Sequence, residues 1–121
     1  MSSADKSFQT YRSVTTDTLL ARREEILTML PEFDLAHVMR ASLITRFVKC
    51  GKPNCRCANG KGHESLYLSS YYKGKTRLDS VPKPYRDKIS RCIQDYHELI
   101  ALLSELSSIN LELFRRREID F

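Results

Sequence analysis

The 121-residue chain contains few of the residues that interrupt regular structure, only four glycines and four prolines, and no segment of it is of low complexity. Its apolar runs are short, and none approaches the roughly 20 consecutive apolar residues that a membrane-spanning helix needs. The first fifteen residues are polar and lack the apolar region of a signal peptide. These absences predict a cytoplasmic protein without a membrane partner.

The sequence also lacks the motifs of several enzyme classes. We find no Walker phosphate-binding loop, no dinucleotide-binding fingerprint, no His-Glu-x-x-His helix and no zinc-deaminase pattern. Gly74-Lys75-Thr76 resembles the end of a Walker loop, but the upstream glycine is missing and a hairpin suits its surroundings better. We therefore expect no catalytic residues and a protein that is not an enzyme.

Only four cysteines are present, and three of them lie in the run Cys50-Gly-Lys-Pro-Asn-Cys55-Arg-Cys57-Ala-Asn-Gly-Lys-Gly-His63. Three thiols and one imidazole form a standard closed ligand set for tetrahedral Zn²⁺. In the reducing cytoplasm, clustered cysteines favour metal over disulfides. The sequence thus predicts one structural Zn²⁺ bound by Cys50, Cys55, Cys57 and His63. A disulfide or redox pair and simple free thiols are the alternatives. Cys92, within an apolar stripe, is expected to be a small core residue.

The net charge of +5 is concentrated in the middle of the chain. Residues 46–91 carry 12 basic and 3 acidic side chains, which gives +9, whereas residues 1–45 and 92–121 carry −1 and −3. A localised positive field is typical of proteins that bind polyanions, although a basic surface also serves simply to keep a protein soluble. The excess falls on the segment that contains the cysteine cluster.

The hydrophobic pattern predicts an α+β fold with a flexible tail (residues 1–15) followed by a single domain (16–121). A helix capped by Thr15, Thr16 or Asp17 should end before Pro31. The expected parts of the domain are a helical segment (16–40), a zinc knuckle with a small antiparallel sheet of about three strands (41–82) and a long C-terminal helix (83–117). Strands are predicted at 43–49, 65–72 and 76–81, with Gly74 at positive φ in the hairpin turn.

The long helix should run from residue 85 to about 116 without a breaker, roughly 45 Å at 1.5 Å per residue. Its apolar stripe is predicted to contain Ile89, Ile93, Tyr96, Ile100, Leu103 and Leu106, broadened by neighbours that include Ile109 and Leu113. This stripe exceeds what one short helix can cover. We therefore expect part of it to pack on the N-terminal helix, or on a second copy of the chain as a homodimer.

The motifs of the middle segment are Cys-Gly-Lys-Pro-Asn-Cys-Arg-Cys (50–57), Gly62-His63, Tyr67-Leu68-Ser69, Gly74-Lys75-Thr76 and a Val81-Pro82 step into a long helix. In these motifs, residues 41–110 resemble a family of small prokaryotic proteins described as a domain of unknown function. The resemblance implies a Cys/His knuckle, a hairpin and a long helix, in mobile-element and nucleic-acid contexts, but no activity. Where the family commonly continues Gly-Pro-Tyr-Tyr, this chain has Glu64-Ser65-Leu66-Tyr67, which weakens attraction for phosphate and removes one stacking surface.

We expect this module to bind nucleic acid, DNA rather than RNA, as an accessory to a mobile-element or recombination system. Cations would contact phosphates and a tyrosine would stack on bases. The predicted contact residues are Lys49, Lys52, Arg56, Lys61, Tyr71, Lys73, Lys75, Arg77, Lys83 and Arg86. The alternative is a zinc-stabilised interaction module, or an adaptor subunit of a larger protein assembly, that dimerises through its long helix.

Overall fold

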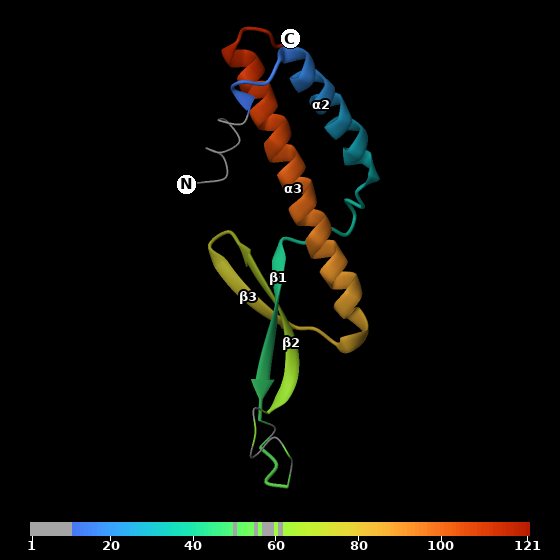
Figure 1. Cartoon of the computed structure of the whole chain (residues 1–121). Coiled ribbons are helices and arrows are strands. Elements are labelled where there is room, and N and C mark those ends of the chain that lie inside the picture. The colour runs from blue at the N-terminus through green and yellow to red at the C-terminus, as the bar shows by residue number, and fades with distance from the viewer. Residues whose placement is uncertain (1–10, 50, 55, 57–59, 61) are drawn as a thin grey trace. The chain divides into compact units, whose positions relative to one another are not determined.

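A computed structural model describes residues 11–49, 51–54, 56, 60 and 62–121. It shows an N-terminal helix, a three-stranded antiparallel sheet and a long C-terminal helix, which confirms the predicted α+β fold (Figure 1). Each predicted strand lies within two residues of its observed bounds, whereas the first helical segment ends at Glu32 instead of residue 40 and α3 begins at Arg86 instead of residue 83. The elements are α2 (Thr16–Met29), η1 (Leu30–Glu32), β1 (Ala41–Val48), β2 (His63–Tyr72), β3 (Lys75–Ser80), η3 (Lys83–Tyr85) and α3 (Arg86–Arg115).

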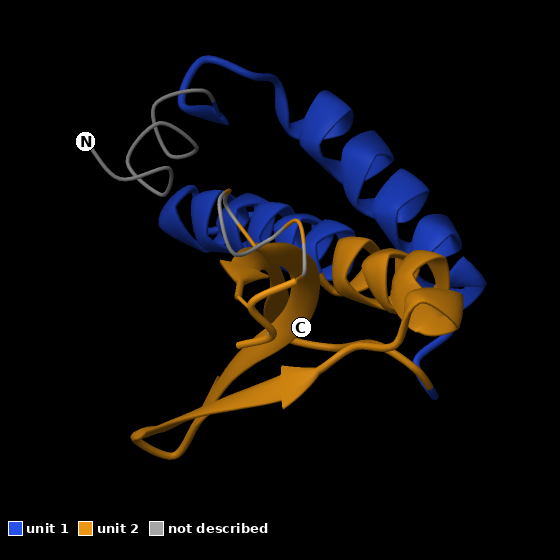
Figure 2. Ribbon diagram, turned by 90° about the horizontal axis from the view of Figure 1, so that it is seen from below, with its two compact units in different colours: residues 1–36, 97–121 blue, residues 37–96 orange. Residues whose placement is uncertain are grey.

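The chain divides into two compact units, coloured separately in Figure 2. Unit 1 combines the two sequence ends, residues 1–36 and 97–121, and so contains α2 and the second half of α3. Unit 2 is contiguous, residues 37–96, and contains the sheet and the first eleven residues of α3. The predicted knuckle and the predicted nucleic-acid residues therefore all fall in unit 2.

The bounds of α2 follow from its local sequence. Thr15 is the N-cap: its backbone is extended, and its hydroxyl oxygen accepts a hydrogen bond from the backbone N–H of Thr18 at 3.2 Å. At the other end, Pro31 lies in the short 3-10 helix η1, where its missing N–H breaks no α-helical hydrogen bond. Both predicted signals, the cap and the stop, are confirmed.

The core of unit 1 consists of two residues from α2, Leu19 and Ile26, packed with two from α3, Ile109 and Leu113. All four are at most 1% exposed. Within the predicted stripe of α3, Ile100 and Leu103 are 41% and 42% exposed, so this part of the stripe is not covered by α2. Helix α3 has apolar side chains on two sides, and α2 covers only the side that contains Ile109 and Leu113.

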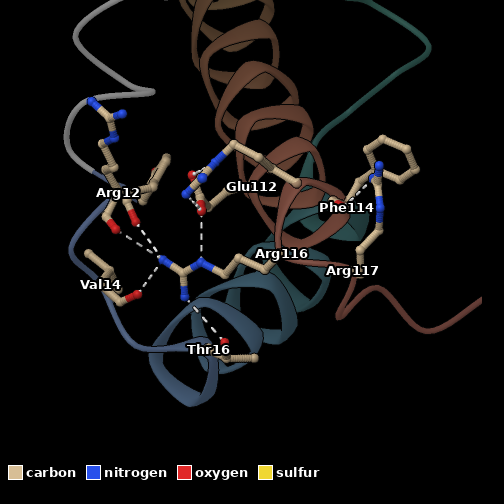
Figure 3. A network of polar contacts seen from close by, with 9 residues as sticks. Arg12, Val14, Thr16, Glu112, Phe114, Arg116 and Arg117 are labelled. Atoms are coloured by element: carbon tan, nitrogen blue, oxygen red, sulfur yellow. Dashed lines mark hydrogen bonds and ion pairs between the residues drawn. The ribbon is translucent and has the colours of Figure 1, made fainter.

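Figure 3 shows a polar network that ties residues 11–16 to the C-terminal end of α3. The Arg116 guanidinium donates to the backbone oxygens of Tyr11 at 3.0 Å and Val14 at 2.6 Å, and to the Thr16 hydroxyl at 3.2 Å. It also donates to the buried carboxylate of Glu112 at 2.7 Å. The last residues of the predicted tail that the structure describes, 11–15, are thus held in unit 1, while residues 1–10 lie outside the described part.

The sheet has the order β1-β2-β3 with both pairs antiparallel. The β2–β3 hairpin turns through Lys73 and Gly74, with φ of +49° and +81°, as two-residue hairpin turns require. The predicted positive φ of Gly74 is confirmed, and Lys73 shares it. In the described part of the chain, no helix is both long and apolar enough to cross a membrane.

Hydrogen bonds from Arg115 and Arg116 lower the pKa of Glu112 below its ordinary value of 4.5. Because the pKa of Glu112 is depressed in the folded state, its ion pairs with the two arginines contribute stability above pH 4.5. That contribution is lost as the pH falls through the pKa that Glu112 has in the folded state. We expect Glu112→Gln to lower the free energy of unfolding by about 3 kcal/mol at pH 7, because two guanidinium groups lose a buried partner. Urea denaturation followed by circular dichroism measures this, and the deficit should shrink toward pH 3.

The matched control is Glu24→Gln, an exposed carboxylate on α2. It should change the free energy of unfolding by less than about 0.5 kcal/mol. A deficit for Glu112→Gln that is equal at pH 7 and pH 3 would contradict the assignment of this network as a pH-dependent tie.

Candidate metal centre and nucleic-acid interface

Strands β1 and β2 bring together the two ends of the segment that contains the cysteine run. Strands β1 and β2 are in a register that sets Val48 directly opposite His63, the last pair of the ladder. The segment 49–62 leaves the end of β1 and returns at the start of β2. Its two ends are therefore held side by side by strand pairing, and in the sequence Cys50 follows Val48 by two residues.

The return into β2 depends on Gly62. Its φ is +95°, and a Cβ built on it would lie 2.6 Å from the backbone carbon of Val48 and 2.8 Å from the backbone nitrogen of Lys49. Atoms at such distances overlap, so a side chain at this position requires the backbone to move. Glycine is thus required here for two reasons, the conformation and the close approach of β1.

Of the four predicted zinc ligands, the structure describes only His63. It is the first residue of β2 and is exposed. Cys50, Cys55 and Cys57 lie outside the described residues; within those residues, no group of three or more His, Cys, Asp or Glu side chains suited to a metal ion occurs. Cys92, predicted to be a small core residue, lies on α3 as a free thiol that is only partly buried.

Nine of the ten predicted nucleic-acid residues lie in the described part of unit 2, and all nine are exposed. The tenth, Lys61, lies outside it. Three are in the loop between β1 and β2, four are on or beside the β2–β3 hairpin, and the last two are the first residues of η3 and of α3. In that order they are Lys49, Lys52 and Arg56; Tyr71, Lys73, Lys75 and Arg77; and Lys83 and Arg86.

The sheet distributes the hairpin residues over its two faces. Side chains alternate along a strand, and paired residues share a face. Tyr71 pairs with Thr76, whereas Lys75 pairs with Tyr72 on the other face, together with Arg77. Tyr72 is 71% exposed, and the Lys73 ammonium lies 5.2 Å from the centre of its ring. Each face near the hairpin tip therefore presents one exposed tyrosine, with lysines beside Tyr72.

Sequence reasoning missed Arg46, whose guanidinium lies 5.7 Å from the centre of the Tyr67 ring. The register places both on the face of Tyr71: Ile44 pairs with Tyr67, and Arg46 with Ser65. Tyr67 and Tyr71 are four residues apart on one strand, roughly 13 Å at 3.3 Å per residue. The alternation of side chains along β2 places Tyr67 and Tyr71 on one face. That Arg46 lies on the same face follows only from the register of β1 with β2.

The two units differ in net charge and in how many of their cations form ion pairs. Unit 1 has 7 basic and 11 acidic residues, and four of its arginines form ion pairs with its own carboxylates: Arg22, Arg23, Arg115 and Arg116. Unit 2 has 13 basic and 4 acidic residues, a net charge of +9. Its Arg77 pairs with Asp79 at 2.9 Å, while Lys73, Lys75, Lys83 and Arg86 form no ion pair with a described residue.

A hollow lies where β3 leads through η3 into α3, and it is lined by residues of β2, the end of β3, the connection to η3, Lys83 of η3 and Arg86 of α3. Its lining includes Lys83 and Arg86 together with Glu64, the residue after His63. Glu64, which is predicted to weaken phosphate binding, thus lines the same hollow as two of the predicted cations. Phosphate contact at this hollow would meet one negative and two positive charges.

Unit 2 has little core of its own. Among its described residues, only Ala41 and Val81 are buried, both with small side chains. Phe47, Val48 and Leu78 are exposed on the sheet. A three-stranded sheet with so little buried apolar area needs a further source of stability.

Comparison with known families finds that the model described as a domain of unknown function (DUF6788) matches residues 16–91, well over half of the chain. No curated protein and no solved structure matches the chain.

We expect Gly62→Ala to destabilise unit 2 by at least about 2 kcal/mol more than Gly74→Ala. Both positions have positive φ, but a Cβ at Gly74 meets nothing within 4 Å, whereas one at Gly62 meets the backbone of β1. Gly74→Ala therefore measures the conformational cost alone, about 1 kcal/mol. Urea denaturation followed by tyrosine fluorescence reports on this unit, which contains five of the six tyrosines. Equal effects of the two substitutions would contradict the close approach.

Proposed function

We propose that this chain, which belongs to the DUF6788 family of domains of unknown function, is a small non-enzymatic protein that binds one structural Zn²⁺ and contacts nucleic acid. The observation that carries the proposal is the composition of unit 2: a sheet almost without buried side chains, with a charge of +9 and exposed cations. Such a unit buries little apolar area and has an excess of positive charge. A bound Zn²⁺ would supply folding free energy, and nucleic acid would neutralise the positive charge.

A metal supports the first part of the proposal. The strand pairing of Val48 with His63 holds together both ends of the segment that contains the three thiols. We propose Cys50, Cys55, Cys57 and His63 as the ligands, because soft thiolates and imidazole are the donors that Zn²⁺ prefers. A structural Zn²⁺ would supply folding free energy to a unit that buries little apolar area.

Exposed cations support the second part of the proposal. Arg and Lys side chains that are already paired with carboxylates have little to gain from phosphate, and in unit 1 four arginines are so paired. In unit 2, Lys73, Lys75, Lys83 and Arg86 are exposed and form no ion pair with a described residue. Tyr71 and Tyr72 offer exposed rings on both faces of the sheet, which suit stacking on bases.

We propose DNA as the preferred polymer and a mobile-element or recombination system as the context. Both rest on the contexts implied by the motif resemblance of residues 41–110. Exposed tyrosine rings stack on bases that are unpaired, and the hairpin presents one such ring on each face. Single-stranded DNA is therefore the first ligand to test, in parallel with duplex DNA and RNA of the same sequence.

A second candidate function is that of an adaptor that binds protein through α3. The observation that favours it is a set of large apolar side chains on α3 that α2 leaves uncovered: Ile100, Leu103, Leu111 and Phe114. The two functions use different units and are compatible in one chain.

The metal proposal predicts one zinc per purified chain, lost in Cys55→Ser and in Cys57→Ser, because a missing thiolate opens the closed shell. Elemental analysis after gel filtration measures the stoichiometry. Cys92→Ser is the matched control, since this free thiol lies on α3 and should leave one zinc per chain. Unchanged zinc in both knuckle variants, or none in the parent chain, would overturn the ligand assignment.

The nucleic-acid proposal predicts that Lys75→Gln and Lys83→Gln each reduce the salt slope of DNA binding by about 1, since each removes one phosphate contact. Fluorescence anisotropy with a labelled oligonucleotide, between 50 and 200 mM salt, measures the slope. Arg12→Gln removes an exposed cation of unit 1 and should leave the slope unchanged. Absent binding, or binding insensitive to salt, would contradict the proposal even where zinc is present.

A further inference from the structure

The four exposed large apolar residues of α3 in unit 1 are arranged symmetrically in the sequence. Ile100, Leu103, Leu111 and Phe114 are 41%, 42%, 49% and 48% exposed. Relative to Ser107 they stand at −7, −4, +4 and +7, which are spacings that recur on one face of a helix. An apolar face with this symmetry is complementary to a second copy of itself running in the opposite direction.

This face also lacks charge. Between Glu98 and Arg115, the only charged residues of α3 are Glu105 and Glu112. Both are turned toward the covered side of the helix: Glu105 accepts two hydrogen bonds from Arg22 on α2, at 2.6 and 2.8 Å, and Glu112 is buried against Arg116. The exposed side of residues 99–114 is thus uncharged, in a chain in which 29% of residues are charged.

We propose that this face binds a second copy of the chain, with the two α3 helices antiparallel and the two-fold axis at Ser107. Two-fold symmetry requires that if residue i contacts residue j of the partner, then j contacts i. Here Ile100 would meet the partner's Phe114, and Leu103 the partner's Leu111. The small side chain of Ser107 at the axis lets the helices approach closely. This proposal deepens the second candidate function and depends on neither zinc nor nucleic acid.

The charge distribution selects the antiparallel orientation over a parallel one. Arg115, Arg116 and Arg117 follow the face directly, and the Arg117 guanidinium stacks 4.3 Å from the centre of the Phe114 ring. A parallel pair would bring this cluster against its own copy, which costs free energy through like-charge repulsion. The antiparallel pair separates the two clusters to opposite ends of the interface. The paired stretch also stays within the unit 1 part of α3.

The C-terminal residues enlarge the surface. Together with the helix face they form a groove, lined by Leu103, Ser107, Leu111, Phe114, Ile119 and Phe121. Phe121 is 98% exposed, although its neighbour Asp120 is held at 2.8 Å by Arg23. Covering these apolar side chains on both copies would bury on the order of 1,000 Å², which is enough for a specific interface at the small end of the observed range.

The test is the oligomeric state of the full chain by light scattering over a concentration series. The parent chain should be a dimer, and Leu103→Glu should weaken it at least about 100-fold, because two charges enter the apolar interface. Leu27→Glu is the matched control: Leu27 is 43% exposed, lies on α2 of the same unit and is not part of the groove. A parent chain that stays monomeric, or equal weakening by both variants at unchanged helix content, would overturn the proposal and leave the face for a different protein.

The register has its own test. Adding Leu111→Lys to Leu103→Glu places opposite charges across an antiparallel pair at both contact points, and should recover at least about tenfold of the lost affinity. Leu103→Glu with Phe114→Lys keeps the same charges but sets them against Leu111 and Ile100 of the partner, and should recover none. Recovery in the second variant only, or in neither, would overturn the antiparallel register.

Discussion

The pairing of Val48 with His63 is the constraint on which the site depends. It fixes where the segment with the three clustered cysteines begins and ends, and it brings β1 so close to Gly62 that a side chain there would overlap the backbone of Val48. A metal bound in this segment would act on ends that are already fixed. The ordering entropy of a loop closed by the sheet is smaller than that of a free chain, which favours binding.

Stability and charge are divided between the two units in opposite ways. Unit 1 buries a cluster of four large side chains and pairs four arginines with its own carboxylates, as in the bidentate contact of Arg22 with Glu105. Unit 2 buries only Ala41 and Val81 among its described residues and leaves most of its cations toward solvent. The first arrangement is that of a scaffold. The second is typical of a surface that gains free energy by binding something.

The fold could be predicted because its boundaries are set by local chemistry. Thr15 caps α2, Pro31 ends it, and Lys73-Gly74 turns the hairpin, each acting through its nearest neighbours. The covered side of α3 could not be predicted in the same way. Leu103 and Ile109 are equally apolar in sequence, and only the position of α2 decides that one is exposed and the other buried. The same holds for the sheet: Tyr71 and Lys75 are close in sequence, but the pleat places them on opposite faces, and Arg46 reaches Tyr67 only through the register.

Unit 1 is assembled from the two ends of the chain, and this has a consequence for biosynthesis. Arg22 and Glu105 are separated by 83 residues, and Arg23 and Asp120 by 97. When α2 leaves the ribosome, Ile109 and Leu113, which pack on Leu19 and Ile26, have not yet been synthesised. Until then the apolar side of α2 is exposed to solvent. Contacts this distant in sequence form slowly. All of unit 2, residues 37–96, is synthesised before the part of α3 that completes unit 1.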